Sequence, residues 1–150
     1  MDLTTLMVAD EAKPVDLTHP VTFRPMGTAE KPVRVMIVPP SHPRMRAVER
    51  RIADARVQNA MNARGRMKLT AEEIENEAIE RLVASIESWE GIELGGKVLK
   101  VSAENARMMM TTPGLRWLRN QVDIALGDVG TFLTTEESTD SSPSVDSTSL

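Results

Sequence analysis

The side chains that could do acid–base or metal chemistry are few and widely separated in this 150-residue chain. Its two histidines, His19 and His42, each stand beside a proline, and neither has an Asp, Glu or Cys partner at the spacing of a metal site. We therefore expect both to be exposed loop histidines. The chain has no cysteine, which excludes disulfides, thiolate metal sites and a cysteine nucleophile and fits a reducing compartment.

Glutamates are concentrated between residues 72 and 80, where they could serve as general acids or metal ligands. Their spacing follows a solvated helix face, so we expect ordinary carboxylates. Gly91, Gly95 and Gly96 do not follow a buried parallel strand, which argues against a phosphate-binding glycine loop. The sequence thus predicts a protein that is not an enzyme and has no catalytic residues, metal site or cofactor site.

Arginines form the next group that could bind a ligand. The segment from Arg44 to Lys68 holds eight bases and two acids, whereas the segment from Glu72 to Glu93 holds eight Glu and one Arg. Clustered arginines could contact phosphates, and Arg46 and Arg50 are candidate partner-binding residues. However, no aromatic residue interleaves them for base stacking, and an acidic segment follows. We expect the two segments to pair their charges, within one chain or between subunits.

Three consecutive methionines, Met108, Met109 and Met110, together with Trp117, form the other candidate partner-binding surface. Successive helical residues point in different directions, so at least one of the three is expected to be exposed. Flexible Met side chains beside a Trp suit the binding of apolar helices of varied sequence. Core packing is the alternative for each of them.

A mixed fold must position these residues, and the hydrophobic pattern predicts an α+β protein that is mainly α. Residues 1–40 are a β-rich lead-in, in which Val15 and Leu17 flank Asp16 and residues 33–38 form the best strand. We expect two or three short antiparallel strands here. So small a sheet needs a helix to cover its apolar face.

About four helices are expected in residues 41–134. Ser41 is expected to cap the first, with Pro43 in its first turn and Gly65 at its end. The second begins at a capping box, Thr70-Ala-Glu-Glu73. Its apolar stripe recurs at helical spacing and consists of Ile74, Ala78, Leu82, Ile86 and Trp89. We therefore expect Trp89 to end this helix and to anchor it in the core.

A short hairpin is expected at residues 92–101, because Gly95 and Gly96 suit a type I′ turn. A short helix follows. Pro113 is then expected to occupy the first position of a final helix of about twenty residues, after a cap at Thr112. The apolar face of this helix consists of Leu115, Leu118, Val122, Ala125, Val129 and Phe132.

One globular domain is expected over residues 1–134, followed by a disordered acidic tail at residues 135–150. The tail is rich in Ser and Thr and holds four acids and no base, so it has too little apolar surface to order itself. The N-terminus lacks the pattern of a signal peptide, and no apolar run approaches the roughly 20 residues that span a bilayer. We expect a cytoplasmic protein without a membrane partner.

Several motifs occur in a particular order along the chain. They are P-V-R-V-M-I-V, an Arg-rich helix, L-T-A-E-E-I-E-N-E-A-I-E-R-L, W-E-G-I-E-L-G-G-K, S-A-E-N-A-R, T-P-G-L-R-W-L-R-N-Q-V and a closing T-F-L. Over roughly residues 3–134 the chain resembles the small tail assembly chaperones of long-tailed bacteriophages and prophages. The most specific part is W-x-G-I-x-L-x-G, followed by S-x-E-N-A, a Pro-started helix with Q-V, and F-L.

The resemblance implies a non-enzymatic protein that binds the tape measure protein, keeps it soluble and helps recruit tail tube subunits. It would act in the host cytoplasm and be absent from the mature virion. The acidic tail departs from the family pattern, in which chains stop soon after F-L. Two other interpretations stay open: a structural minor tail or head-completion protein, and a nucleic-acid-binding regulator that uses the Arg-rich helix. The oligomeric state is also open, a homo-oligomer included, and so is the existence of a longer frameshifted form.

Overall fold

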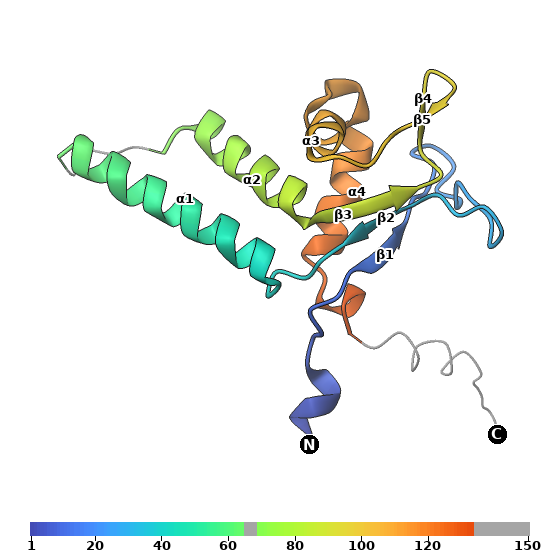
Figure 1. Cartoon of the computed structure of the whole chain (residues 1–150), viewed down its shortest axis with the longest axis horizontal. Coiled ribbons are helices and arrows are strands. Elements are labelled where there is room, and N and C mark those ends of the chain that lie inside the picture. The colour runs from blue at the N-terminus through green and yellow to red at the C-terminus, as the bar shows by residue number, and fades with distance from the viewer. Residues whose placement is uncertain (65–68, 134–150) are drawn as a thin grey trace.

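Strands from distant parts of the chain form one antiparallel sheet (Figure 1). The computed structural model describes residues 1–64 and 69–133. The sheet has the order β1–β2–β3 and consists of β1 (Lys13–Asp16), β2 (Arg34–Ile37) and β3 (Ile86–Glu90). Asp16, Arg34 and Glu90 lie directly opposite one another on the three strands, so that one arginine stands between two carboxylates.

A helical hairpin is inserted between β2 and β3. It consists of α1 (Pro43–Asn62) and α2 (Ala71–Ser85), which run side by side and project away from the sheet as an arm (Figure 1). The remaining elements are the 3-10 turn η1 (Leu3–Leu6), the hairpin strands β4 (Glu93–Leu94) and β5 (Lys97–Val98), α3 (Ala103–Thr111), η2 (Pro113–Leu115), α4 (Arg116–Leu126) and η3 (Val129–Thr131).

The core lies between one face of the sheet and the helices α2, α3 and α4. Its fully buried side chains include Val35 and Ile37 of β2, Met109 and Met110 of α3, and Val122 of α4. Over the described residues, four α-helices, antiparallel strands near the N-terminus and a hairpin within 92–101 confirm the predicted α+β, mainly α class. Gly65 and the predicted tail lie outside the described residues.

The largest correction to the sequence-based prediction concerns residues 86–90, which form β3 rather than the end of the second helix. Met36 pairs with Ser88 and Ile37 with Ile86, so a register shift leaves Glu87 as an extra residue opposite β2. In a regular strand, residues three apart point to opposite faces of the sheet. The extra residue puts both Ile86 and Trp89 in the core, so their spacing resembles that of a helical stripe.

The final helix is also shorter than predicted, because α4 ends at Leu126 and Gly127 follows as its C-cap. Glycine is a poor helix former. Thr112 does not cap this helix with its side chain; its hydroxyl donates a hydrogen bond to the carbonyl of Met108 and completes α3 instead. Pro113 begins the 3-10 turn η2, and α4 starts after it.

The starts of the two arm helices follow local capping rules. The predicted capping box is present, since the Thr70 hydroxyl accepts the N–H of Glu73 and the Glu73 carboxylate accepts the N–H of Thr70. At the other helix, His42 replaces the predicted cap Ser41: its Nδ1 accepts the N–H of Arg44 at 3.0 Å. His42 is therefore a half-buried helix cap and not an exposed loop histidine.

Opposite charges on the helices pair, as the segregation of Arg and Glu predicted. Within the arm, Arg56 forms a two-pronged ion pair with Glu77, and Arg81 lies 2.7 Å from the Glu49 carboxylate. Two further pairs join α2 to the body of the protein: Glu75 with Arg119 of α4, and Glu80 with Arg107 of α3. These two pairs connect the arm to the body, and each adds only modestly to stability because their side chains are partly exposed.

Substitution of the core tryptophan should be costly. We expect Trp89→Ala to lower the free energy of unfolding by about 3–5 kcal/mol, because it removes a large buried side chain. Urea unfolding at neutral pH, followed by far-ultraviolet circular dichroism, measures the change. Val98→Ala is the control: Val98 is 80% exposed, so its loss should change stability by less than about 0.5 kcal/mol. Equal stabilities of Trp89→Ala and the wild type would contradict the assigned core.

The ion pairs of α2 predict a dependence of stability on pH. The hydrogen-bonded guanidinium of Arg56 lowers the pKa of Glu77 below its ordinary value of 4.5, and that of Arg107 does the same for the pKa of Glu80. A carboxyl group whose pKa is lower in the folded state than in the unfolded state stabilises the fold fully at pH values above its unfolded-state pKa. This stabilisation is lost as the pH falls through its folded-state pKa.

We therefore expect the free energy of unfolding to fall between about pH 5 and pH 3. It should fall less steeply in a Glu77→Gln, Glu80→Gln double variant. Urea titrations at several pH values test this. A Glu30→Gln variant, altered in an exposed loop, should follow the wild type. If the double variant shows the same pH dependence of stability as the wild type, the two ion pairs do not contribute to that dependence.

Candidate functional site: an apolar groove

The β4–β5 hairpin, the loop between β1 and β2, and the chain from α3 to the start of α4 enclose an apolar groove of about 190 Å³. Among the described residues that line it, Glu93 is the only charged one. Six of the lining residues bear on its chemistry: Met26, Ile92, Leu94, Met108, Leu115 and Trp117. The groove is therefore suited to apolar side chains.

Glycines shape the hairpin wall of the groove. Gly95 and Gly96 have φ angles of +61° and +81°, as the predicted type I′ turn requires. The N–H of Leu99 donates to the carbonyl of Ile92 at 2.9 Å and closes the base of the hairpin. The turn thus holds Leu94 outward at the mouth of the groove, where it is 58% exposed.

Trp89 ties this hairpin to the sheet. Its indole N–H donates to the carbonyl of Leu99 at 2.9 Å, while its ring lies in the core and is only 7% exposed. A tryptophan suits this position because it combines a large apolar surface with one donor. The hairpin therefore cannot swing away from the groove without breaking a partly buried hydrogen bond.

Gly91 is a residue whose role the sequence did not reveal. Its φ is +78°, and a Cβ atom at this position would lie 2.3 Å from the carbonyl oxygen of Pro32. Only glycine allows β3 to pass this close to the loop that precedes β2. The contact joins residues almost sixty positions apart, so no local pattern could have predicted it.

The structure brings together some of the sequence-predicted binding residues. Met108 and Trp117 both line the groove and are half-buried. Met109 and Met110 are each 1% exposed and belong to the core, because the face of α3 that packs on α2 and α4 carries them. Of these two, only Met109 also lines the groove.

Arg46 and Arg50 lie elsewhere. Both are exposed on α1 of the arm, and α1 does not line the groove. Their neighbour Arg44 donates to the carbonyls of Ala84 and Ile86 and so fastens the base of the arm. Since Arg44 and the ion-paired Arg56 are engaged within the chain, the Arg-rich helix offers phosphates less positive charge than its sequence indicates.

Pro113 and Phe132, which the sequence marked as structural, lie at the ends of the α4 segment. Pro113 is exposed and begins η2, the turn that carries Leu115 into the groove. Phe132 lies in the core just after η3 and is 3% exposed. Their positions therefore set where α4 starts and hold the chain that follows it against the body.

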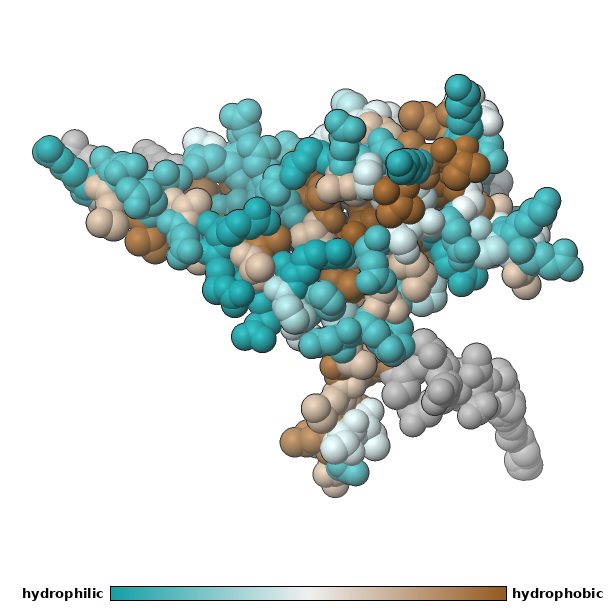
Figure 2. Space-filling model, viewed as in Figure 1, coloured by the Kyte–Doolittle hydropathy of each residue, from teal (hydrophilic) through white to brown (hydrophobic). Residues whose placement is uncertain are grey.

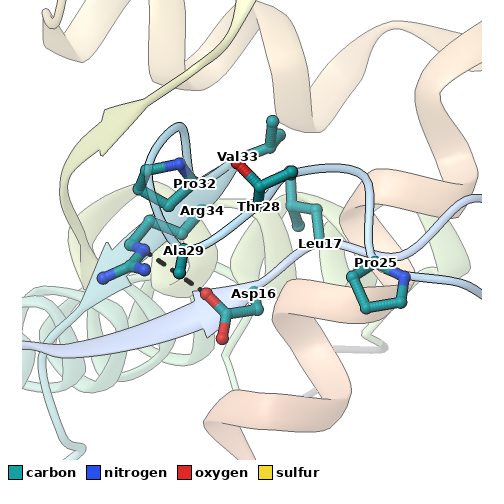
Figure 3. Close-up of a pocket in the computed structure, with 9 residues that line it drawn as sticks. Asp16, Leu17, Pro25, Thr28, Ala29, Pro32, Val33 and Arg34 are labelled. Carbon is teal, nitrogen blue, oxygen red and sulfur yellow. Dashed lines mark ion pairs between the residues drawn. The ribbon is translucent and has the colours of Figure 1, made fainter.

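A second hollow, of about 300 Å³, is lined by residues near the end of β1 and the start of β2 and by the loop between these strands (Figure 3). The Nε of Arg34 is 3.3 Å from a carboxylate oxygen of Asp16 and equally far from one of Glu90, so its charge is neutralised within the sheet.

Over residues 1–64 and 69–133, no three His, Cys, Asp or Glu side chains gather as a metal site would require. Nor is any helix in those ranges long and apolar enough to cross a membrane.

Exposed apolar residues also lie outside the groove. Val98 stands on β5 opposite Glu93, and Val101, which follows before α3, lines a separate hollow beside α1 and α2. Figure 2 shows apolar side chains gathered around the end of the molecule where β4 and β5 lie. The alternating E-L-G-G-K-V pattern predicted the hairpin but did not show that both its apolar residues face solvent.

The described residues that line the groove thus offer mainly apolar contacts. Its residues come from three separate parts of the chain. Comparison of the chain with protein-family models, with curated proteins and with solved structures finds no match.

Proposed function

We propose that this protein is a tail assembly chaperone of a long-tailed bacteriophage or prophage, which binds the tape measure protein and keeps it soluble. The observation that carries the proposal is the apolar groove, in which Met108 and Trp117 lie together beside Leu94. The motifs that carry the resemblance support the proposal, because they contribute to the groove. Leu94 of W-E-G-I-E-L-G-G-K lines it, as do Leu115 and Trp117 of T-P-G-L-R-W-L.

The size of the groove fits the side chains of a helical client. At about 190 Å³ it is smaller than the pockets that hold drug-sized ligands, so it receives a few side chains rather than a whole helix. An amphipathic helix presents such side chains at spacings of three and four residues. Met108 can adapt its flexible side chain to different ones, which suits a client of varied sequence.

Weak single sites are sufficient for such a client. A long helical protein offers many apolar segments, and chaperones bound along one chain shield it collectively. Where two such sites are linked, the second binding step gains from effective concentration. The proposal therefore requires modest affinity for each segment and no catalytic chemistry.

The proposed role places the protein in the host cytoplasm during tail assembly. There it would hold the tape measure protein, help recruit tail tube subunits, and leave before the tail is mature. The resemblance in sequence supports this part of the proposal. Of the two exposed apolar residues of the hairpin, which lie on opposite faces of it, Leu94 lines the groove and is available to a client.

Co-expression with the client tests the proposal. We expect a tape measure fragment from the same phage to stay soluble and to co-elute with this protein in size-exclusion chromatography. Leu94→Glu should reduce the soluble fraction about tenfold, because it places a charge at the mouth of an apolar site. Ile124→Glu, which changes a still more exposed apolar residue on α4 outside the groove, should behave as the wild type. A client that precipitates equally with and without the wild-type protein would overturn the proposal.

The composition of mature particles provides a second test. A chaperone that leaves before maturation should be absent from purified virions in quantitative mass spectrometry, while it is abundant in the infected cell. Its presence at a fixed number of copies per particle would favour a structural minor tail or head-completion protein instead.

A further inference from the structure

The first half of α1 carries positive charge that the described part of the fold does not neutralise. Arg46 and Arg50 are exposed, and no ion pair joins either of them to another of the residues that the structure describes. The adjacent carboxylate of Glu49 is engaged by Arg81 at 2.7 Å. The first turn of α1 contains no acidic residue. These two arginines are therefore available to an anionic partner.

The two arginines share one face of the helix. They are four residues apart, which places them one above the other, and like charges at this spacing repel. An anion bound between them would relieve that repulsion. Arg44 and Arg51, by contrast, line the hollow between α1, α2 and α3, which also contains Glu80. Arg46 and Arg50 do not line this hollow, so its carboxylates do not serve them.

The described part of the chain ends beside the start of this helix. Phe132 lines one hollow together with Pro40 and Ser41, and α1 begins two residues after Ser41, at Pro43 (Figure 1). Phe132 is only 3% exposed, so its burial fixes this position. The chain that follows Leu133 therefore starts next to the first turn of α1.

The sequence that follows is acidic. Residues 135–150 contain no Lys, Arg or His, so no base within this tail competes for its carboxylates. Three of its four acids come within seven residues of Leu133. The four are Glu136, Glu137, Asp140 and Asp146.

The lengths of chain and helix are compatible with a contact. An extended chain spans at most about 3.5 Å per residue, so the first two acids of the tail can reach about 10–14 Å from Leu133 and the third about 25 Å. Because a helix rises about 1.5 Å per residue, Arg46 and Arg50 lie about 5 and 10 Å along α1 from Pro43. Arg64, at the far end of the arm, is about 30 Å from Pro43 by the same measure.

From the charges, the position where the described chain ends and these lengths, we infer that the acidic tail, residues 135–150, binds to Arg46 and Arg50 of the same chain. Its first three carboxylates pair with the two guanidinium groups. Each exposed ion pair is weak and is screened by salt, but a tethered ligand acts at a high effective concentration. The contact shields the Arg-rich helix from phosphates and other polyanions. It does not depend on the identity of the client.

Paramagnetic relaxation measures where the tail binds. The chain has no cysteine, so Ser138→Cys gives one site for a nitroxide label among the acids of the tail. At low salt we expect this label to broaden the amide signals of residues 46–50. Raising NaCl to about 0.5 M should reduce the broadening at least about twofold, because salt screens exposed charges.

Replacing the arginine pair tests whether these charges hold the tail. In the labelled protein, Arg46→Gln with Arg50→Gln should reduce the broadening at least about twofold at low salt, because it removes both cations. Arg64→Gln, which changes an exposed arginine at the other end of the arm, should leave the broadening unchanged. Broadening of residues 46–50 that is the same with and without the arginine pair would overturn the inference.

Binding of a polyanion tests the shielding. Neutralising the tail by Glu136→Gln, Glu137→Gln and Asp140→Asn should tighten binding of fluorescein-labelled heparin about threefold or more at low salt, in an anisotropy titration. Adding Arg46→Gln and Arg50→Gln should abolish this gain, because these are the cations that the tail releases.

A control with the same net charge separates shielding from a general charge effect. Glu30→Gln, Glu93→Gln and Asp123→Asn neutralise three exposed acids outside the tail and should tighten heparin binding less than the tail variant does. An equal gain in both variants would show that the tail does not shield the arginine pair. Either result leaves the proposed function intact, since that function depends on the groove.

Discussion

The pairing of β2 with β3 is the constraint on which the rest of the structure depends, because these strands hold both ends of the helical arm. The chain enters α1 a few residues after β2, and α2 runs into β3 without an intervening residue. The N–H of Val38 donates to the carbonyl of Ser85 at 2.8 Å, and both residues are buried. Pairing therefore continues to the base of the arm. It also fixes the core face of the sheet and the end of β3 from which the groove's hairpin begins.

Local signals in the sequence were sufficient for elements that local interactions determine. The capping box at Thr70 and the glycine turn at Gly95 and Gly96 satisfy their own hydrogen bonds or dihedral angles, and both were predicted. The boundary at Ser85 was not predicted, because it depends on β2, about fifty residues earlier. The register shift near Ile86 places this residue and Trp89 on one side at a helical spacing. Hydrophobic periodicity alone cannot distinguish a strand with such a shift from the end of an amphipathic helix.

The groove was predictable in its residue types but not in its shape. A Met-rich helix and a Trp indicated an apolar binding surface, yet the packing of α3 decides that Met108 lines the groove while Met110 enters the core. The contribution of the β1–β2 loop could not be seen, since it depends on the close approach of Gly91 to Pro32. Phe23 stood in a stretch that could equally form a strand. Its exposure and its positive φ cannot be read from a sequence.

Several residues of the motif W-E-G-I-E-L-G-G-K have identifiable structural roles, and these roles decide what a resemblance in this motif implies. Trp89 bonds the hairpin base, Gly91 permits the close loop contact, and the glycine pair makes the turn. Each of these roles is architectural, because none of the three places a functional group in the groove. Two other residues of the same motif, Ile92 and Leu94, line the groove, whereas Met26 and Met108 line it from outside the motif. The motif therefore supplies both the frame of the groove and part of its apolar lining, so a chain can keep the motif and still change what it binds through the lining residues that lie outside it.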